Sequence, residues 1–141
     1  MPSAVLDTTA LVSAFLTATP GGAAFELLQF ASAGRYELIL SDPILVEVAD
    51  VLLNRAHLRR RYLYPDRAVA AYVTGLRATA SLVSDLPNLN VVRDPTDNVI
   101  LATAVAGAAD FLCTRDNDLL DLKRHGNVTI LRPEDLLARL R

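Results

Sequence analysis

The sequence predicts a single α/β domain, spanning residues 1–141, in which a parallel sheet is covered by helices on both faces. Short apolar runs of four or five residues alternate with segments of helical periodicity. Continuous apolar runs of this length are typical of strands buried on both faces, and their alternation with helices favours parallel pairing. A chain of 141 residues that is 52% hydrophobic and 21% charged is long and apolar enough to form one core.

Six runs are predicted as strands. They are residues 3–6, 37–40, 82–83, 91–92, 110–114 and 128–131. A turn or loop is predicted at residues 19–22, before the second helix, and another turn at residues 85–88, between the strands 82–83 and 91–92.

The helices are predicted from apolar spacing and from their terminal residues. They cover residues 10–16, 23–33, 43–53, 65–80 and 95–107, with a last helix that begins at Pro133. Gly34 is expected to end the second of these helices. Asp94 and Pro95 form a cap-then-proline start, and Asp42 and Pro43 repeat it.

Composition excludes several classes of function. No apolar run reaches the roughly 18–20 residues of a membrane span, and no signal peptide is recognisable, so a cytoplasmic protein is expected. The single cysteine, Cys113, permits no internal disulfide, and His57 and His125 are too few for a zinc site.

The charge balance does not favour nucleic-acid binding, since the net charge is −2. One local basic stretch, residues 55–61, could still contact RNA, or it could be the solvated face of a helix end. Its cationic residues are Arg55, Arg59, Arg60 and Arg61.

Acidic residues are expected to gather at one edge of the sheet. Asp7 follows the first strand, Asp116 follows the strand that ends near Thr114, and Asp97 begins the helix after residues 91–92. The carboxyl ends of parallel strands share an edge, and Glu47 lies one helical turn from it. Converging carboxylates need a cation, and oxygen-only ligands suit Mg²⁺ or Mn²⁺, which can activate water for attack on a phosphodiester.

Several neighbouring acidic and hydroxyl residues have a simpler interpretation. Asp94 is explained fully as a helix cap, and Asp118 and Asp121 as solvent-facing turn acids. Thr8 and Thr114 could orient a carboxylate or touch a phosphate, whereas Thr9 is interpreted as an ordinary turn hydroxyl.

In order along the chain, these segments resemble the PIN domain, the ribonuclease fold of many VapC-like toxins of toxin–antitoxin systems. The matching segments are Val5-Leu6-Asp7-Thr8-Thr9, then residues 40–47, 93–104, 109–120, 128–131 and 133–136. The resemblance implies a three-layer α/β/α sandwich that cleaves RNA with Mg²⁺ or Mn²⁺, often as a homodimer that a small antitoxin inhibits.

The family's acidic quartet falls on four residues of this chain, with Asp118 as an auxiliary acid. The four are Asp7, Glu47, Asp97 and Asp116. Asp7, Asp97 and Asp116 would hold the metal, and Glu47 would position or deprotonate the attacking water. The chain departs from the family at Thr9, where asparagine is common, and at Arg115, where glycine is usual. Arg115 could grip phosphate or alter access.

Two other functions remain open at this point. In the first, a phosphotransfer or phosphatase-like α/β domain would use Asp7 as the phosphoryl acceptor. In the second, a PIN-like module would bind RNA without cleaving it.

Overall fold

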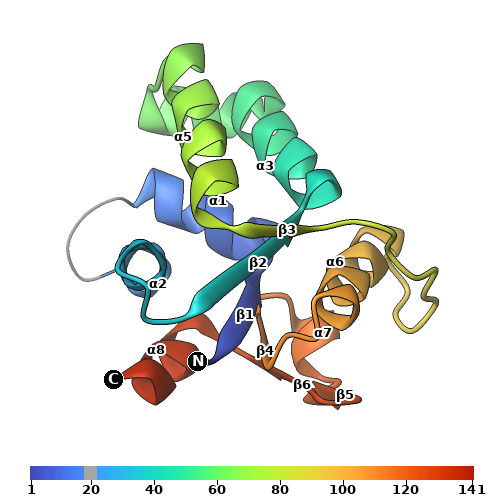
Figure 1. Cartoon of the computed structure of the whole chain (residues 1–141). Coiled ribbons are helices and arrows are strands. Elements are labelled where there is room, and N and C mark those ends of the chain that lie inside the picture. The colour runs from blue at the N-terminus through green and yellow to red at the C-terminus, as the bar shows by residue number, and fades with distance from the viewer. Residues whose placement is uncertain (18–21) are drawn as a thin grey trace.

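The computed structural model describes residues 1–17 and 22–141, and in these residues six strands form one sheet (Figure 1). The strands are β1 (Ser3–Leu6), β2 (Glu37–Ser41), β3 (Ser81–Val83), β4 (Phe111–Cys113), β5 (Arg124–His125) and β6 (Val128–Leu131). Their order is β3-β2-β1-β4-β6-β5, and every neighbouring pair is parallel except β5 with β6. The predicted parallel sheet is therefore confirmed.

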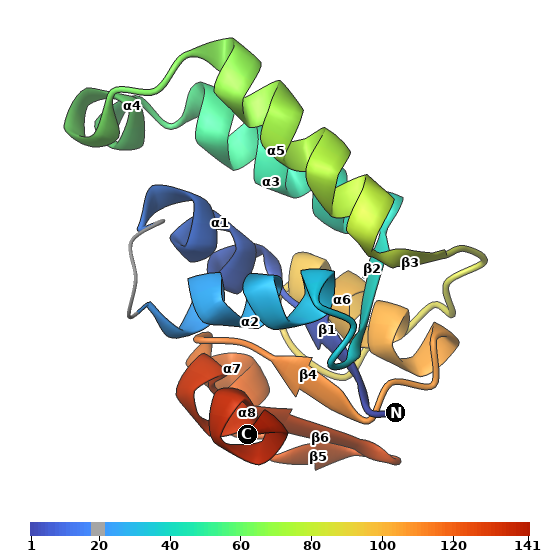
Figure 2. The same cartoon turned by 60° about the vertical axis from the view of Figure 1, so that its left-hand side comes forward.

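Helices lie on both faces of this sheet, as predicted. The described helices are α1 (Thr8–Leu16), α2 (Ala23–Ser32), α3 (Asp42–Asn54), α4 (Ala56–Tyr62), α5 (Asp66–Thr79), α6 (Pro95–Ala106), α7 (Asn117–Leu120) and α8 (Pro133–Leu140). Helix α6 contacts β1, β2 and β4 on one face, while α1, α2 and α8 lie on the other (Figures 1 and 2). Helices α3 and α5 pack together as a pair, with the short α4 projecting beyond them (Figure 2).

The apolar runs form the core because the central strands are covered on both faces. Leu6, Leu40 and Leu112 are fully buried, and helix residues such as Leu101 pack against them. Among the described helices, none combines the length and the hydrophobicity needed to cross a bilayer.

Most predicted helix ends are confirmed by their local geometry. Gly34 follows α2 with a φ of +73°, the left-handed conformation expected of a terminating glycine. Asp94 caps α6 by accepting a hydrogen bond of 2.9 Å from the Thr96 N–H. In the predicted turn at residues 19–22, residues 19–21 lie outside the described part of the chain, and Gly22 is the N-cap of α2.

The start of α3 differs from the prediction by one residue. Asp42 is the first residue of the helix and Ser41 occupies the cap position. The Asp42 carboxylate pairs instead with Arg77 at 2.8 Å. The Ser41 hydroxyl forms no cap bond either, because it bonds the Thr103 hydroxyl at 2.8 Å between α3 and α6.

The predicted strand at residues 91–92 is wrong. The backbone N–H groups of Val91 and Val92 donate to the side-chain oxygen of Asn98, at 2.9 and 3.0 Å. The Asn98 amide nitrogen donates back to the Val92 carbonyl at 2.8 Å and to the Asp94 carbonyl at 3.3 Å. One buried side chain thus satisfies backbone groups that a neighbouring strand would otherwise have to satisfy.

Strand β5 is a further difference from the prediction. It pairs antiparallel with β6 through only two residues, Arg124 and His125. Gly126, with a φ of +56°, turns the chain between the two strands. A two-residue strand carries no periodic pattern, so the sequence does not indicate it.

Two glycines provide a test of how closely α6 packs on the sheet. A Cβ at Gly107 would lie 2.7 Å from Ile39 Cγ2 and 3.1 Å from Ile39 Cδ1, whereas one at Gly75 in α5 would meet nothing within 4 Å. We expect Gly107→Ala to destabilise the fold by about 1–3 kcal/mol through overpacking. Gly75→Ala, its control, is expected to stabilise it by ~0.5–1 kcal/mol. Urea unfolding of both variants checks this, and equal midpoints would contradict it.

Candidate functional site

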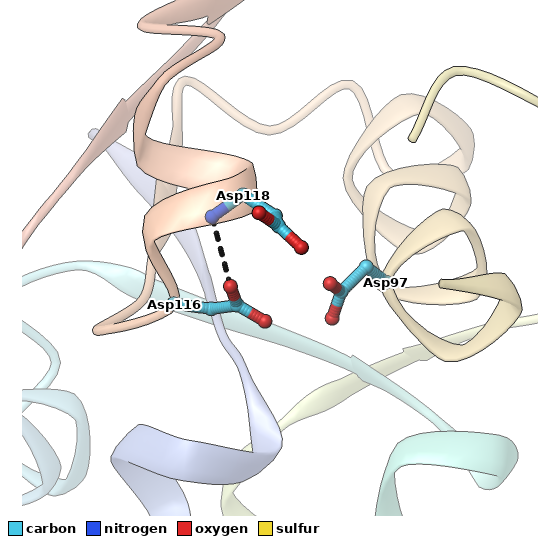
Figure 3. Close-up of side chains that lie close together, drawn as sticks. All are labelled: Asp97, Asp116 and Asp118. Atoms are coloured by element: carbon cyan, nitrogen blue, oxygen red, sulfur yellow. Dashed lines mark hydrogen bonds between the residues drawn. The ribbon is translucent and has the colours of Figure 1, made fainter. Parts of the chain in front are cut away.

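Three carboxylates face one another between the N-terminal ends of α6 and α7 (Figure 3). Asp97 lies in the first turn of α6, Asp116 caps α7, and Asp118 lies in the first turn of α7. One oxygen of each lies within 4.8 Å of an oxygen of the other two. Asp97 is only 6% exposed, Asp116 is half-buried and Asp118 is exposed, so the cluster opens to solvent on the α7 side.

Backbone geometry holds these carboxylates in place. Asp94 and Pro95 fix the start of α6, which places Asp97 one turn beyond the cap. Asp116 Oδ1 accepts a hydrogen bond of 2.9 Å from the Asp118 N–H, drawn as a dashed line in Figure 3. The first turn of each helix also contributes its positive dipole end to this acidic site.

Asp97 is the carboxylate of the cluster whose charged form is disfavoured most clearly. Its pKa is raised to about 7, first by burial and then by the contact with Asp116 and the charges of Asp116, Asp94 and Asp7. Its Oδ2 is buried and has no hydrogen-bond partner. A buried carboxylate oxygen without a partner is costly, and a cation among the three carboxylates would relieve both the repulsion and the missing contact.

Asp7 lies at the end of β1, where its backbone N–H still bonds the Cys113 carbonyl of β4 at 3.0 Å. It is 1% exposed. Its Oδ1 accepts hydrogen bonds from the Thr9 hydroxyl at 2.7 Å and from the Ala10 N–H at 2.9 Å. Burial raises its pKa, and these bonds oppose that rise. Asp7 therefore also caps α1, which begins two residues before the predicted start.

Thr114 connects two of the predicted site acids. Its buried hydroxyl donates to Asp7 Oδ2 at 2.5 Å and accepts from the Asp116 N–H at 2.9 Å. The structure thus agrees with the expectation that Thr114 orients a carboxylate.

The interpretation of Thr9 as an ordinary turn hydroxyl is wrong, because its hydroxyl bonds Asp7 and also accepts a 3.4 Å bond from the Arg115 N–H. The sequence signal for this contact is the position of Thr9, two residues after an aspartate that caps a helix. Thr9 therefore supplies a contact to Asp7 at the position where asparagine is common in the family.

Glu47 approaches from α3 and is not one of the three clustered carboxylates. Burial raises its pKa; the nearby Thr8 hydroxyl lowers it, Asp94 and Asp7 raise it, and Arg55 lowers it. Glu47 lines one cavity together with Thr8, the neighbour of Asp7, and another together with Thr96, the neighbour of Asp97. The first of these cavities has a volume of about 360 Å³ and lies between α1, α3 and α4.

The predicted RNA-contacting arginines have different surroundings. Arg59 is held inside the domain: it donates to the Leu53 and Tyr64 carbonyls and pairs with Asp66 at 2.6 Å. Arg115 pairs with Glu134 of α8 at 2.6 Å. Three other arginines are exposed and belong to none of the ion pairs in residues 1–17 and 22–141. They are Arg55, Arg60 and Arg61.

Comparison with known proteins agrees with this geometry. The sequence profile of the PIN domain matches residues 3–118. A structure of VapBC2 from Rickettsia felis, bound to a DNA fragment from its promoter, is similar with a TM-score of 0.61 at 15% identity. The similarity covers 91% of this chain and 96% of that one. No curated protein sequence matches significantly. Since the profile covers most of the sequence, including Asp7, Asp97 and Asp116, the chain belongs to the PIN domain family.

Proposed function

We propose that the protein is a Mg²⁺- or Mn²⁺-dependent endoribonuclease and the toxin of a toxin–antitoxin pair. The observation that carries the proposal concerns Asp97 of this PIN domain. Its Oδ2 is buried without a hydrogen-bond partner, and its carboxylate faces those of Asp116 and Asp118. PIN domains are generally nucleases, so a nucleic acid is the class of substrate that family membership supports.

The side chains fit a hard divalent cation, because every nearby donor is an oxygen. Asp97 and Asp116 would hold it, together with Asp7, whose Oδ2 accepts only the bond from Thr114 and keeps a lone pair available. Asp118, exposed at the mouth, would act as the auxiliary ligand. A bound Mg²⁺ would supply Lewis acidity toward the scissile phosphate and a lowered pKa for water.

Glu47 would position or deprotonate the attacking water. Its half-buried position and raised pKa make it a stronger base than an exposed glutamate. Arg55, which lines the same cavity as Glu47, would offset the repulsion between the acidic site and an approaching phosphate. Arg60 and Arg61 would contact the RNA backbone farther from the cut, whereas Arg59 is occupied within the domain.

The biological assignment rests on similarity. The VapC-like resemblance and the VapBC2 structure both support a small antitoxin as the inhibiting partner. A homodimeric toxin in the cytoplasm belongs to the proposal through the resemblance alone. The phosphotransfer alternative is less favoured, because an acceptor Asp7 would be 1% exposed with both oxygens hydrogen-bonded.

Cleavage of RNA by the purified protein tests the proposal. We expect cleavage with Mg²⁺ or Mn²⁺, none with EDTA, and a rate at least about a hundredfold lower for Asp7→Asn and Asp116→Asn, since each variant removes a negative charge from a proposed metal ligand. Asp121→Asn is the matched control, because Asp121 is exposed and lies outside the three-carboxylate cluster.

Equal cleavage by all these variants, or in EDTA, would refute the assignment. A rise in melting temperature on adding Mn²⁺ without cleavage of any RNA pool would favour the non-catalytic RNA-binding module instead.

A further inference from the structure

The cavity between α1, α3 and α4 is open to solvent, and it borders the candidate site at Glu47 and at Thr8, the neighbour of Asp7. At one end it is lined by Thr8 and Glu47, beside the acidic residues. Its wall is apolar, and the residues of this wall are Val12, Leu16, Val51 and Leu58. Its volume of about 360 Å³ is within the range of ~300–1,000 Å³ that small-molecule sites occupy.

Thr8 gives this cavity an unsatisfied polar group. The side chain is 5% exposed, and its Oγ1 has no hydrogen-bond partner. It lies near Glu47 without a hydrogen bond of good geometry. A buried hydroxyl normally finds a partner, but this one has almost no contact with solvent and lies beside Glu47 in the cavity wall.

The other end of the cavity is cationic and aromatic. Arg55, His57 and Tyr62 line it, and Arg61 lies over the Tyr62 ring at 5.5 Å. This wall belongs to α4, which Arg59 ties to the end of α3 and to the start of α5 through Leu53 and Asp66. The wall is thus braced from inside the domain although none of the residues of α4 is buried.

We propose that this cavity receives the base of one unpaired nucleotide adjoining the scissile phosphate. The proposal rests on the proposed nuclease function and adds to it a binding site for one base. Apolar walls and a tyrosine suit a nucleobase, and Arg55 and His57 suit the flanking phosphate. Bases within a duplex cannot enter such a cavity, whereas unstacked bases are read in this way.

Binding of RNA in EDTA tests the cavity without cleavage. The probes are fluorescein-labelled hexamers of adenylate and of uridylate, compared with a hexamer of the same backbone that is fully abasic. We expect at least one base-containing hexamer to bind the wild-type protein roughly tenfold more tightly than the abasic one. Ser13→Phe, which fills the cavity from α1, should reduce that affinity to the abasic level and leave abasic binding unchanged.

Two further variants guard against a folding defect in Ser13→Phe. Tyr62→Ala alters an exposed side chain, and it should remove part of the preference for bases. Arg55→Gln and Arg60→Gln form a matched pair of exposed arginines, of which only Arg55 lines the cavity. We expect roughly a fivefold loss of affinity for Arg55→Gln and less than about twofold for Arg60→Gln.

Wild-type affinity for the base-containing hexamers in both Ser13→Phe and Tyr62→Ala would overturn the proposal. If those variants lose inhibition by a protein partner but keep their RNA binding, the proposal is also overturned. The cavity would then bind a side chain of that partner. Failure of the nuclease assignment looks different: the hexamers would still bind with a preference for bases, and no RNA would be cut with any metal.

Discussion

Asp97→Asn is expected to abolish RNA cleavage and, without divalent metal at pH 8, to stabilise the fold by about 2 kcal/mol. The reason is that burial and the neighbouring carboxylates raise the pKa of the wild-type Asp97 carboxyl from its ordinary value near 3.8 to about 7 in the folded protein. The folded state therefore binds more protons than the unfolded state between about pH 4 and pH 7. The free energy of unfolding consequently falls as the pH rises through this window.

Urea unfolding in EDTA at pH 5 and pH 8 measures this effect. The wild-type protein should lose stability between the two values, and Asp97→Asn should lose less. Added Mn²⁺ should stabilise the wild-type protein and leave the variant unaffected. Asp94→Asn is the matched control: asparagine is also a good N-cap, so that variant should keep most of its stability and its metal response. A destabilised Asp97→Asn protein at pH 8 would contradict the argument.

Thr114→Val is expected to lower the free energy of unfolding by about 2–3 kcal/mol and cleavage by roughly ten- to a hundredfold. Valine keeps the shape of the side chain and removes the hydroxyl that donates to Asp7 and accepts from the Asp116 N–H. Both site acids then lose an orienting contact in a fully buried position. Chemical denaturation and kcat/KM for RNA measure the two losses.

Thr103→Val is the control for a buried hydroxyl remote from the carboxylates. Thr103 is also fully buried, and its hydroxyl bonds Ser41 and the Val99 carbonyl inside α6. The Thr103→Val variant should lose stability with little loss of kcat/KM. Thr114→Ser, which keeps the hydroxyl, should retain both the stability and the kcat/KM that Thr114→Val loses. Equal catalytic losses in Thr103→Val and Thr114→Val would mean that Thr114 acts only through the fold.

The sequence predicted the strands and helices whose apolar pattern is long enough to be read. Residues 3–6, 37–40, 110–114 and 128–131 gave β1, β2, β4 and β6 because buried parallel strands are continuously apolar. Val91 and Val92 have the same local character but end in a loop, because the Asn98 side chain, six or seven residues later, takes their N–H groups. Such a contact leaves no periodic signal.

The candidate site was predicted in outline for a similar reason. Topology places the residues after β1 and β4 at one edge, so the nearness of Asp7 and Asp116 follows from parallel pairing. The direction in which each side chain points does not follow from strand pairing. The Arg59 contacts with Leu53 and Asp66, and the bond from Thr9 to Asp7, depend on rotamers and helix packing that the sequence pattern leaves open.

The hydrogen bonds of Asn98 also make the site tolerant of change in sequence. They join residues 91–94 to the first turn of α6, so the position of Asp97 is fixed locally and does not depend on the path of the chain after β3. Insertions or deletions between residues 84 and 90 should therefore leave the carboxylates in register. Within the family, this is the segment in which we expect chain length to vary most freely without loss of the catalytic arrangement.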